Sequence, residues 1–134
     1  MVRGDCNLKP FDVDLMRLPC KPRGERLLIT DSHDVTGLNN DGFRSTYSYL
    51  YRTDEGLVLY DSLGAGCIRE IRTIGYTGRL KIYVNGSDTP EIDISFDELY
   101  SGRDERFPEN LVCDEIQGHG SAWCYVPVRF QNGC

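Results

Sequence analysis

The richest polar stretch of the chain lies at residues 31–43, which read Asp-Ser-His-Asp-Val-Thr-Gly-Leu-Asn-Asn-Asp-Gly-Phe. Its carboxylates and amides place many hydrogen-bond acceptors close together, which suits either a hard cation or the hydroxyls of a sugar. The spacing and the missing terminal glutamate exclude an EF-hand loop. The alternative is a turn-rich loop whose Asp and Asn side chains bind its own backbone.

A second acidic cluster lies at residues 97–109, where five carboxylates accompany Arg103 and Arg106. Paired carboxylates cleave glycosides, but sequence spacing does not establish the separation of ~5–9 Å that this mechanism needs. A solvated loop is therefore the favoured interpretation. Ser32, His33 and Asp34 stand side by side. Adjacent residues point in different directions, so these three do not form a catalytic triad.

Composition bounds the class of protein. The 134 residues make one ordinary domain, and 21 acidic against 15 basic side chains give a net charge of -6. This charge argues against nucleic acids and anionic membranes as partners. No apolar run approaches the ~18 residues of a spanning helix, and the N-terminus lacks the apolar stretch of a signal peptide. We expect a cytoplasmic protein as written, or a piece of something longer, with secretion or a periplasmic location left open.

The cysteines and histidines indicate no metal or cofactor. Six cysteines show no CxxC pair and no zinc spacing, and only His33 and His119 are present. We expect mostly reduced, buried thiols, with one or more disulfides as the alternative. No cofactor is predicted.

The hydrophobic pattern predicts strands. Alternation or short apolar runs mark residues 46–51, 57–60, 79–84, 91–97 and 122–130, with a turn at Asn85-Gly86 and a break or edge at Pro127. Residues 68–74 are interpreted as a strand with a bulge, although a spacing of three also suits a helix. Residues 11–18 could form one short N-terminal helix. The fold class is all-β, a single jelly roll or β-sandwich.

Five blocks in order resemble one family, glycoside hydrolase family 172. They are residues 14–18 (Asp-Leu-Met-Arg-Leu), the 31–43 loop, residues 63–71 (Leu-Gly-Ala-Gly-Cys-Ile-Arg-Glu-Ile), residues 80–86 with Pro90-Glu91-Ile92, and residues 125–130 (Tyr-Val-Pro-Val-Arg-Phe). The resemblance covers about residues 12–134. Asp31, Leu38 and Ala65 depart from the family's pattern.

The resemblance implies a first jelly roll of a tandem pair, preceded by an arm at residues 1–20, so that the roll spans residues 21–134. It also favours a strand at 68–74. It implies a retaining hydrolase of fructofuranosides or arabinofuranosides and a homo-oligomer, a trimer or larger. The family's two catalytic glutamates lie in the second roll, so no residue here is assigned as catalytic, and this chain alone is expected to be inactive. The resemblance places four candidate substrate-binding residues in the 31–43 loop: Asp34, Asn39, Asn40 and Asp41.

Two other functions remain open at this point. An acceptor-rich loop and many tyrosines would let a single roll bind carbohydrate without cleaving it. A roll that exposes an apolar face would instead self-assemble, as capsid-like jelly rolls do.

Overall fold

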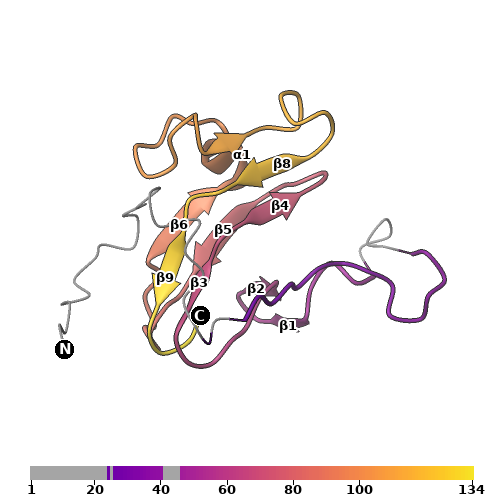
Figure 1. Cartoon of the computed structure of the whole chain (residues 1–134), viewed down its shortest axis with the longest axis vertical. Coiled ribbons are helices and arrows are strands. Elements are labelled where there is room, and N and C mark those ends of the chain that lie inside the picture. The colour runs from indigo at the N-terminus through magenta and orange to yellow at the C-terminus, as the bar shows by residue number, and fades with distance from the viewer. Residues whose placement is uncertain (1–23, 25, 41–45) are drawn as a thin grey trace. The chain divides into compact units, whose positions relative to one another are not determined.

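A computed structural model describes residues 24, 26–40 and 46–134 (Figure 1). The chain divides into two compact units, one formed by Leu63–Cys134 with Met1–Leu15 and the other by Met16–Ser62. The predicted arm at 1–20 and the predicted helix at 11–18 lie outside the described residues. The extent of the roll, 21–134, stays a prediction.

Antiparallel strands build the described part of the larger unit. Its strands pair in three small sheets: β3 (Gly66–Ile68) with β9 (Val128–Phe130), β4 (Ile71–Thr73) with β8 (Ala122–Cys124) and β8 with β7 (Val112–Cys113), and β5 (Arg79–Ile82) with β6 (Ile92–Ser95). Figure 1 shows β3 beside β9 and β4 beside β8. With almost no helix, this arrangement confirms the all-β prediction.

Alternation along β5 and β6 behaves as the sequence predicts. Ile82, Ile92 and Ile94 are buried, whereas Arg79 and Asp93 are exposed and form an ion pair across the two strands, with Nε to Oδ1 at 2.7 Å. Because successive strand residues face opposite sides, one face supplies the core and the other meets water.

The predicted bulge is present, but its extra residue lies on the partner strand. Ile68 pairs with Val128 and Ile71 pairs with Cys124. Two residues between β3 and β4 therefore oppose three between β8 and β9, and Pro127 is among those three. Proline donates no ladder hydrogen bond, so it is tolerated at such a break.

A short helix begins inside the strand predicted at residues 91–97 and continues into the predicted loop. α1 (Phe96–Tyr100) follows β6 directly and contacts β6, β7 and β8. The Ser95 hydroxyl caps it by accepting the Glu98 backbone N–H at 3.2 Å. Phe96 is buried at the position where strand alternation expects an inward side chain, so the apolar pattern alone did not separate strand from helix.

The Asn85-Gly86 turn is hydrogen-bonded to residues 131 and 132. Asn85 and Gly86 both have a positive φ, 60° and 72°. The Asn85 side-chain oxygen accepts the backbone N–H groups of Gln131 and Asn132 at 2.7 and 3.0 Å. The turn thus joins the β5–β6 connection to the segment after β9.

The smaller unit contains a hairpin formed by β1 (Tyr51–Thr53) and β2 (Gly56–Val58). The prediction of a strand over 46–51 is wrong for residues 46–50, which are irregular. Leu50 donates its backbone N–H to the Val58 carbonyl at 2.7 Å, directly before β1 begins. Alternating exposure persists, since Tyr47 and Tyr49 are half-buried and Ser48 is exposed.

No helix within the described ranges has the length and apolar character needed to cross a membrane.

Gly66 supplies a test of the packing between β3 and β9. A Cβ on Gly66 would lie 2.4 Å from Cζ of the buried Phe130 ring, its cross-strand partner. We expect Gly66→Ala to lower the free energy of unfolding by about 1–3 kcal/mol, because the ring must move within a packed core. Urea denaturation measures this. Lys81→Ala, at an exposed strand position, should stay within about 0.5 kcal/mol of wild type. Equal effects of the two substitutions would contradict the packing.

The thiols supply a second test. Cys124 is fully buried, and burial raises its pKa to about 11, whereas Cys113 is only partly buried. At pH 8 only about 0.1% of such a thiol is thiolate, the reactive form. We expect iodoacetamide labelling and peptide mass mapping to show Cys113 modified in the native protein and Cys124 modified only after unfolding. Native labelling of Cys124 at the rate of Cys113 would refute the buried placement.

Candidate functional site

Asp34 is the centre of the 31–40 loop. It is only 8% exposed. Its Oδ1 accepts the backbone N–H of Thr36 at 2.8 Å and the Thr36 hydroxyl at 2.6 Å. Its Oδ2 accepts the backbone N–H of Asn40 at 3.0 Å. These donors, the Thr36 hydroxyl above all, lower the pKa of the Asp34 carboxyl.

The same contacts define what Asp34 can do. Both of its oxygens already accept hydrogen bonds from the chain, so few acceptor positions remain for a ligand. The carboxylate holds the backbone from Thr36 to Asn40 in one loop. Asp34 therefore serves to position the other residues of this loop.

Asn39 and Asn40 carry the side chains that this loop presents. Asn39 is exposed, has a φ of 60°, and forms no side-chain hydrogen bond within the described part of the chain. Asn tolerates this left-handed conformation better than most residues. Asn40 is half-buried, and its Nδ2 donates to the Thr46 hydroxyl at 3.1 Å. Its side-chain oxygen stays available as an acceptor.

The fourth predicted residue, Asp41, lies outside the described residues. The structure therefore brings Asp34, Asn39 and Asn40 together in one loop. Their binding of substrate stays a prediction.

Asp31 and His33 form a local pair next to this loop. The Asp31 carboxylate contacts His33 Nδ1 closely and accepts the His33 backbone N–H at 3.3 Å. The hydrogen bond from the His33 side chain lowers the pKa of Asp31. Both side chains are exposed, so the pair is a surface feature that orients the start of the loop.

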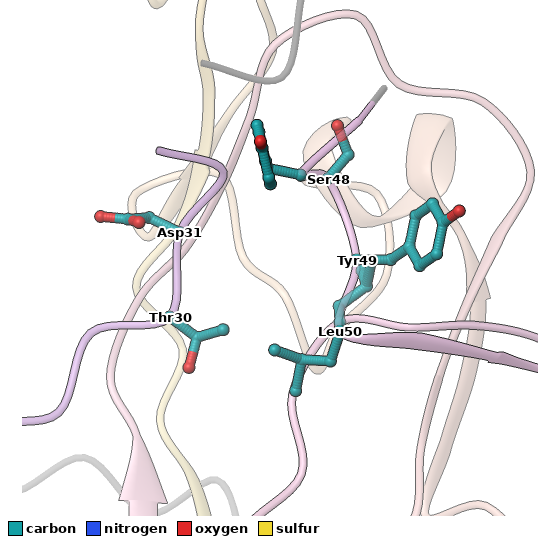
Figure 2. Close-up of a pocket in the computed structure, with 7 residues that line it drawn as sticks. Thr30, Asp31, Ser48, Tyr49 and Leu50 are labelled. Atoms are coloured by element: carbon teal, nitrogen blue, oxygen red, sulfur yellow. The ribbon is translucent and has the colours of Figure 1, made fainter. Parts of the chain in front are cut away.

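A small cavity lies beside the loop in the same unit. It is bounded by two stretches of chain, Thr30–Asp31 on one side and Tyr47–Leu50 with Leu59 on the other, and its volume is about 100 Å³. Figure 2 shows Thr30 and Leu50 pointing toward each other across the opening. The Asp31 carboxylate is turned away from that opening, and so is the ring of Tyr49. The inward surface is thus mostly neutral.

In the second acidic cluster, residues 97–109, several carboxylates stabilise the local structure. Asp97 and Glu98 occupy the first turn of α1, where negative charge favours the helix N-terminus. Asp104 forms an ion pair with Arg106, with Nη2 to Oδ2 at 2.7 Å, and the arginine lowers the pKa of Asp104. These contacts give three of the carboxylates structural roles. The predicted solvated loop is wrong for residues 97–100, which belong to α1 and include the buried Leu99 and Tyr100.

Sequence reasoning did not single out Thr30 or Tyr47 as site residues. The alternation over 46–51 was visible, but it was interpreted as a strand. The only advance signal was that Tyr47 follows the acceptor-rich loop closely in sequence.

The described residues contain no group of three His, Cys, Asp or Glu side chains that could hold a metal ion.

Residues 24–134 match the family model described as GH172 first beta-sandwich domain. No curated protein and no solved structure matches the chain.

The role of Asp34 gives a pH prediction. Its pKa in the folded loop is lowered, so the ionised carboxylate stabilises the loop above its unfolded pKa of about 3.9. This contribution is lost as the pH falls through the folded value. We expect the amide protons of Thr36 and Asn40 to shift together with the Asp34 carboxyl carbon in an NMR titration, at a pH below 3.8.

Asp34→Asn provides the matched variant at neutral pH. The amide keeps one oxygen but directs an NH₂ group at a backbone N–H or at the Thr36 hydroxyl. We expect hydrogen exchange at Thr36 and Asn40 to become faster by on the order of tenfold, with the β1–β2 hairpin unchanged. Unchanged exchange at both amides would show that the carboxylate does not hold the loop.

Proposed function

The chain belongs to the GH172 family, as a first beta-sandwich domain, and on that premise we propose that it forms part of a retaining hydrolase of furanosides. The observation that carries the proposal is the family match over residues 24–134. The substrates proposed are fructofuranosides or arabinofuranosides, as the family resemblance implies.

In the proposed reaction, two glutamates of a second sandwich cleave the glycosidic bond. One attacks the anomeric carbon and the other protonates the leaving oxygen, then activates water. Retention requires their carboxyl groups to lie roughly 5–5.5 Å apart. This chain supplies neither of the two, so the catalytic step depends on the second sandwich.

The proposed contribution of this chain is sugar binding by the Asp34–Asn40 loop. Primary amides suit sugar hydroxyls, because each offers both a donor pair and an acceptor to groups that also do both. Asn39 presents an unengaged amide and Asn40 an acceptor oxygen, both on a backbone that Asp34 holds. Such preorganisation reduces the entropy lost on binding.

Binding of simple glycosides tests this role. We expect the isotopically labelled 134-residue chain to bind methyl arabinofuranoside or methyl fructofuranoside with a Kd on the order of 1 mM, with NMR shifts concentrated at residues 34–40. Methyl glucopyranoside should bind at least several-fold more weakly. Nitrophenyl arabinofuranoside should release no nitrophenol.

Asn39→Gly is the matched variant, because glycine adopts a positive φ without strain and lacks only the amide. We expect a loss of about five- to tenfold in affinity, as for one hydrogen bond. Furanoside shifts that avoid the loop, or affinity that Asn39→Gly leaves unchanged, would contradict the assigned site. Turnover by this chain alone would contradict the assignment of the glutamates to a second sandwich. Binding without turnover when the second sandwich is added would favour a non-catalytic carbohydrate-binding module.

A further inference from the structure

The sequence holds two asparagine–glycine pairs, Asn85-Gly86 and Asn132-Gly133. In such a pair the backbone nitrogen of the glycine can attack the Cγ carbon of the asparagine side chain, because glycine has no Cβ to obstruct the close approach. Both pairs lie in the described part of the larger unit, but they differ in the hydrogen bonds that surround them. That difference decides which of the two reacts in the folded protein.

The attacking nitrogen is hydrogen-bonded in only one of the pairs. The Gly133 N–H donates to the Gly64 carbonyl at 2.8 Å, and Gly133 is buried. The Gly86 N–H forms no hydrogen bond within the described part of the chain, and Gly86 is exposed. Because the nitrogen must give up its proton to attack, reaction at Asn132 first requires a hydrogen bond to break, which slows it about fivefold.

The attacked carbonyl is also different in the two pairs. Asn85 Oδ1 accepts the backbone N–H groups of Gln131 and Asn132, at 2.7 and 3.0 Å. Negative charge develops on this oxygen as the glycine nitrogen attacks, and two N–H donors at such distances form an oxyanion hole for it. The Asn132 side chain accepts no hydrogen bond from the residues that the structure describes.

The turn at Asn85 opposes the reaction, but its effect is smaller. Asn85 has a φ of 60°, and the Ser87 N–H closes the turn by donating to the Val84 carbonyl at 3.1 Å. Rotation about the Asn85 Cα–C bond, which brings the Gly86 nitrogen to Cγ, breaks this hydrogen bond. Its loss slows the attack about fivefold, whereas one donor of an oxyanion hole accelerates acyl chemistry about a hundredfold.

We propose that Asn85 is a deamidation site of the folded protein and that Asn132 is protected. In the first step the Gly86 nitrogen bonds to Cγ and the bond from Cγ to Nδ2 breaks. Ammonia leaves with the proton of the Gly86 N–H, so that a cyclic imide remains. Water then opens the imide at either of its two carbonyls, which gives aspartate or isoaspartate without any oxidant or reductant.

The two products affect the segment after β9 differently. Aspartate keeps a side-chain oxygen for the N–H groups of Gln131 and Asn132. In isoaspartate the main chain runs through the Cβ carbon, so that the remaining carboxylate no longer lies where these N–H groups point. The modification therefore releases the segment after β9 only when it yields isoaspartate. This inference is independent of sugar binding.

Incubation of the full chain in mildly alkaline buffer, followed by peptide mass mapping, tests the site. We expect the Asn85 peptide to exchange its amide nitrogen for oxygen at least about tenfold faster than the Asn132 peptide. In the same buffer with urea, where the hydrogen bonds of both turns are lost, the two rates should be similar. Equal rates in the folded chain, or a faster reaction at Asn132, would overturn the proposal. A difference that persists in urea would overturn it too, because the selectivity would then belong to the sequence.

Gln131→Pro and Gln131→Ala are the matched variants. Proline removes one N–H donor of the oxyanion hole and suits the extended backbone of Phe130 before it, whereas alanine keeps the donor. We expect Gln131→Pro to slow deamidation of Asn85 about tenfold or more and Gln131→Ala to leave its rate within about twofold of wild type. An unchanged rate in a Gln131→Pro chain whose NMR spectrum keeps the β3–β9 pairing overturns the oxyanion hole. If Gln131→Pro does not fold, the comparison of the folded wild type with the chain in urea decides.

Discussion

The buried carboxylate of Asp34 is the constraint on which the candidate site depends. It accepts hydrogen bonds from Thr36 and Asn40 within the loop. Asp34 is only 8% exposed, and a buried carboxylate is stable when such donors replace its lost water. These hydrogen bonds lower the pKa of Asp34, and they also hold the backbone that carries Asn39.

The residues of this loop therefore fall into two classes. Residues with saturated hydrogen bonds build the site, and residues with unused groups face a ligand. Asp34 belongs to the first class, whereas Asn39 belongs to the second. A carboxylate in a polar loop therefore need not touch the substrate for the loop to bind it.

Sequence reasoning recovered the parts of the fold that have local causes. Strict alternation predicted β5 and β6 with their buried isoleucines, and Pro127 marked the break between β8 and β9. The helix α1 was missed because its first buried residue, Phe96, continues the strand period. The strand predicted at 46–50 is absent because alternation reports which side chains are buried but cannot supply a partner strand.

The candidate site was predicted only as a set of residue types. The acceptor-rich loop was visible, but whether Asp34 would face a ligand or its own backbone depends on a turn at Gly37, whose φ is 75°.

A crystal structure of the chain with methyl arabinofuranoside bound would test the central claim most directly. The account predicts that the sugar contacts the Asn39 amide while the Asp34 carboxylate keeps its hydrogen bonds to Thr36 and Asn40. A sugar whose hydroxyls bind the Asp34 oxygens directly, with those backbone bonds broken, would contradict it.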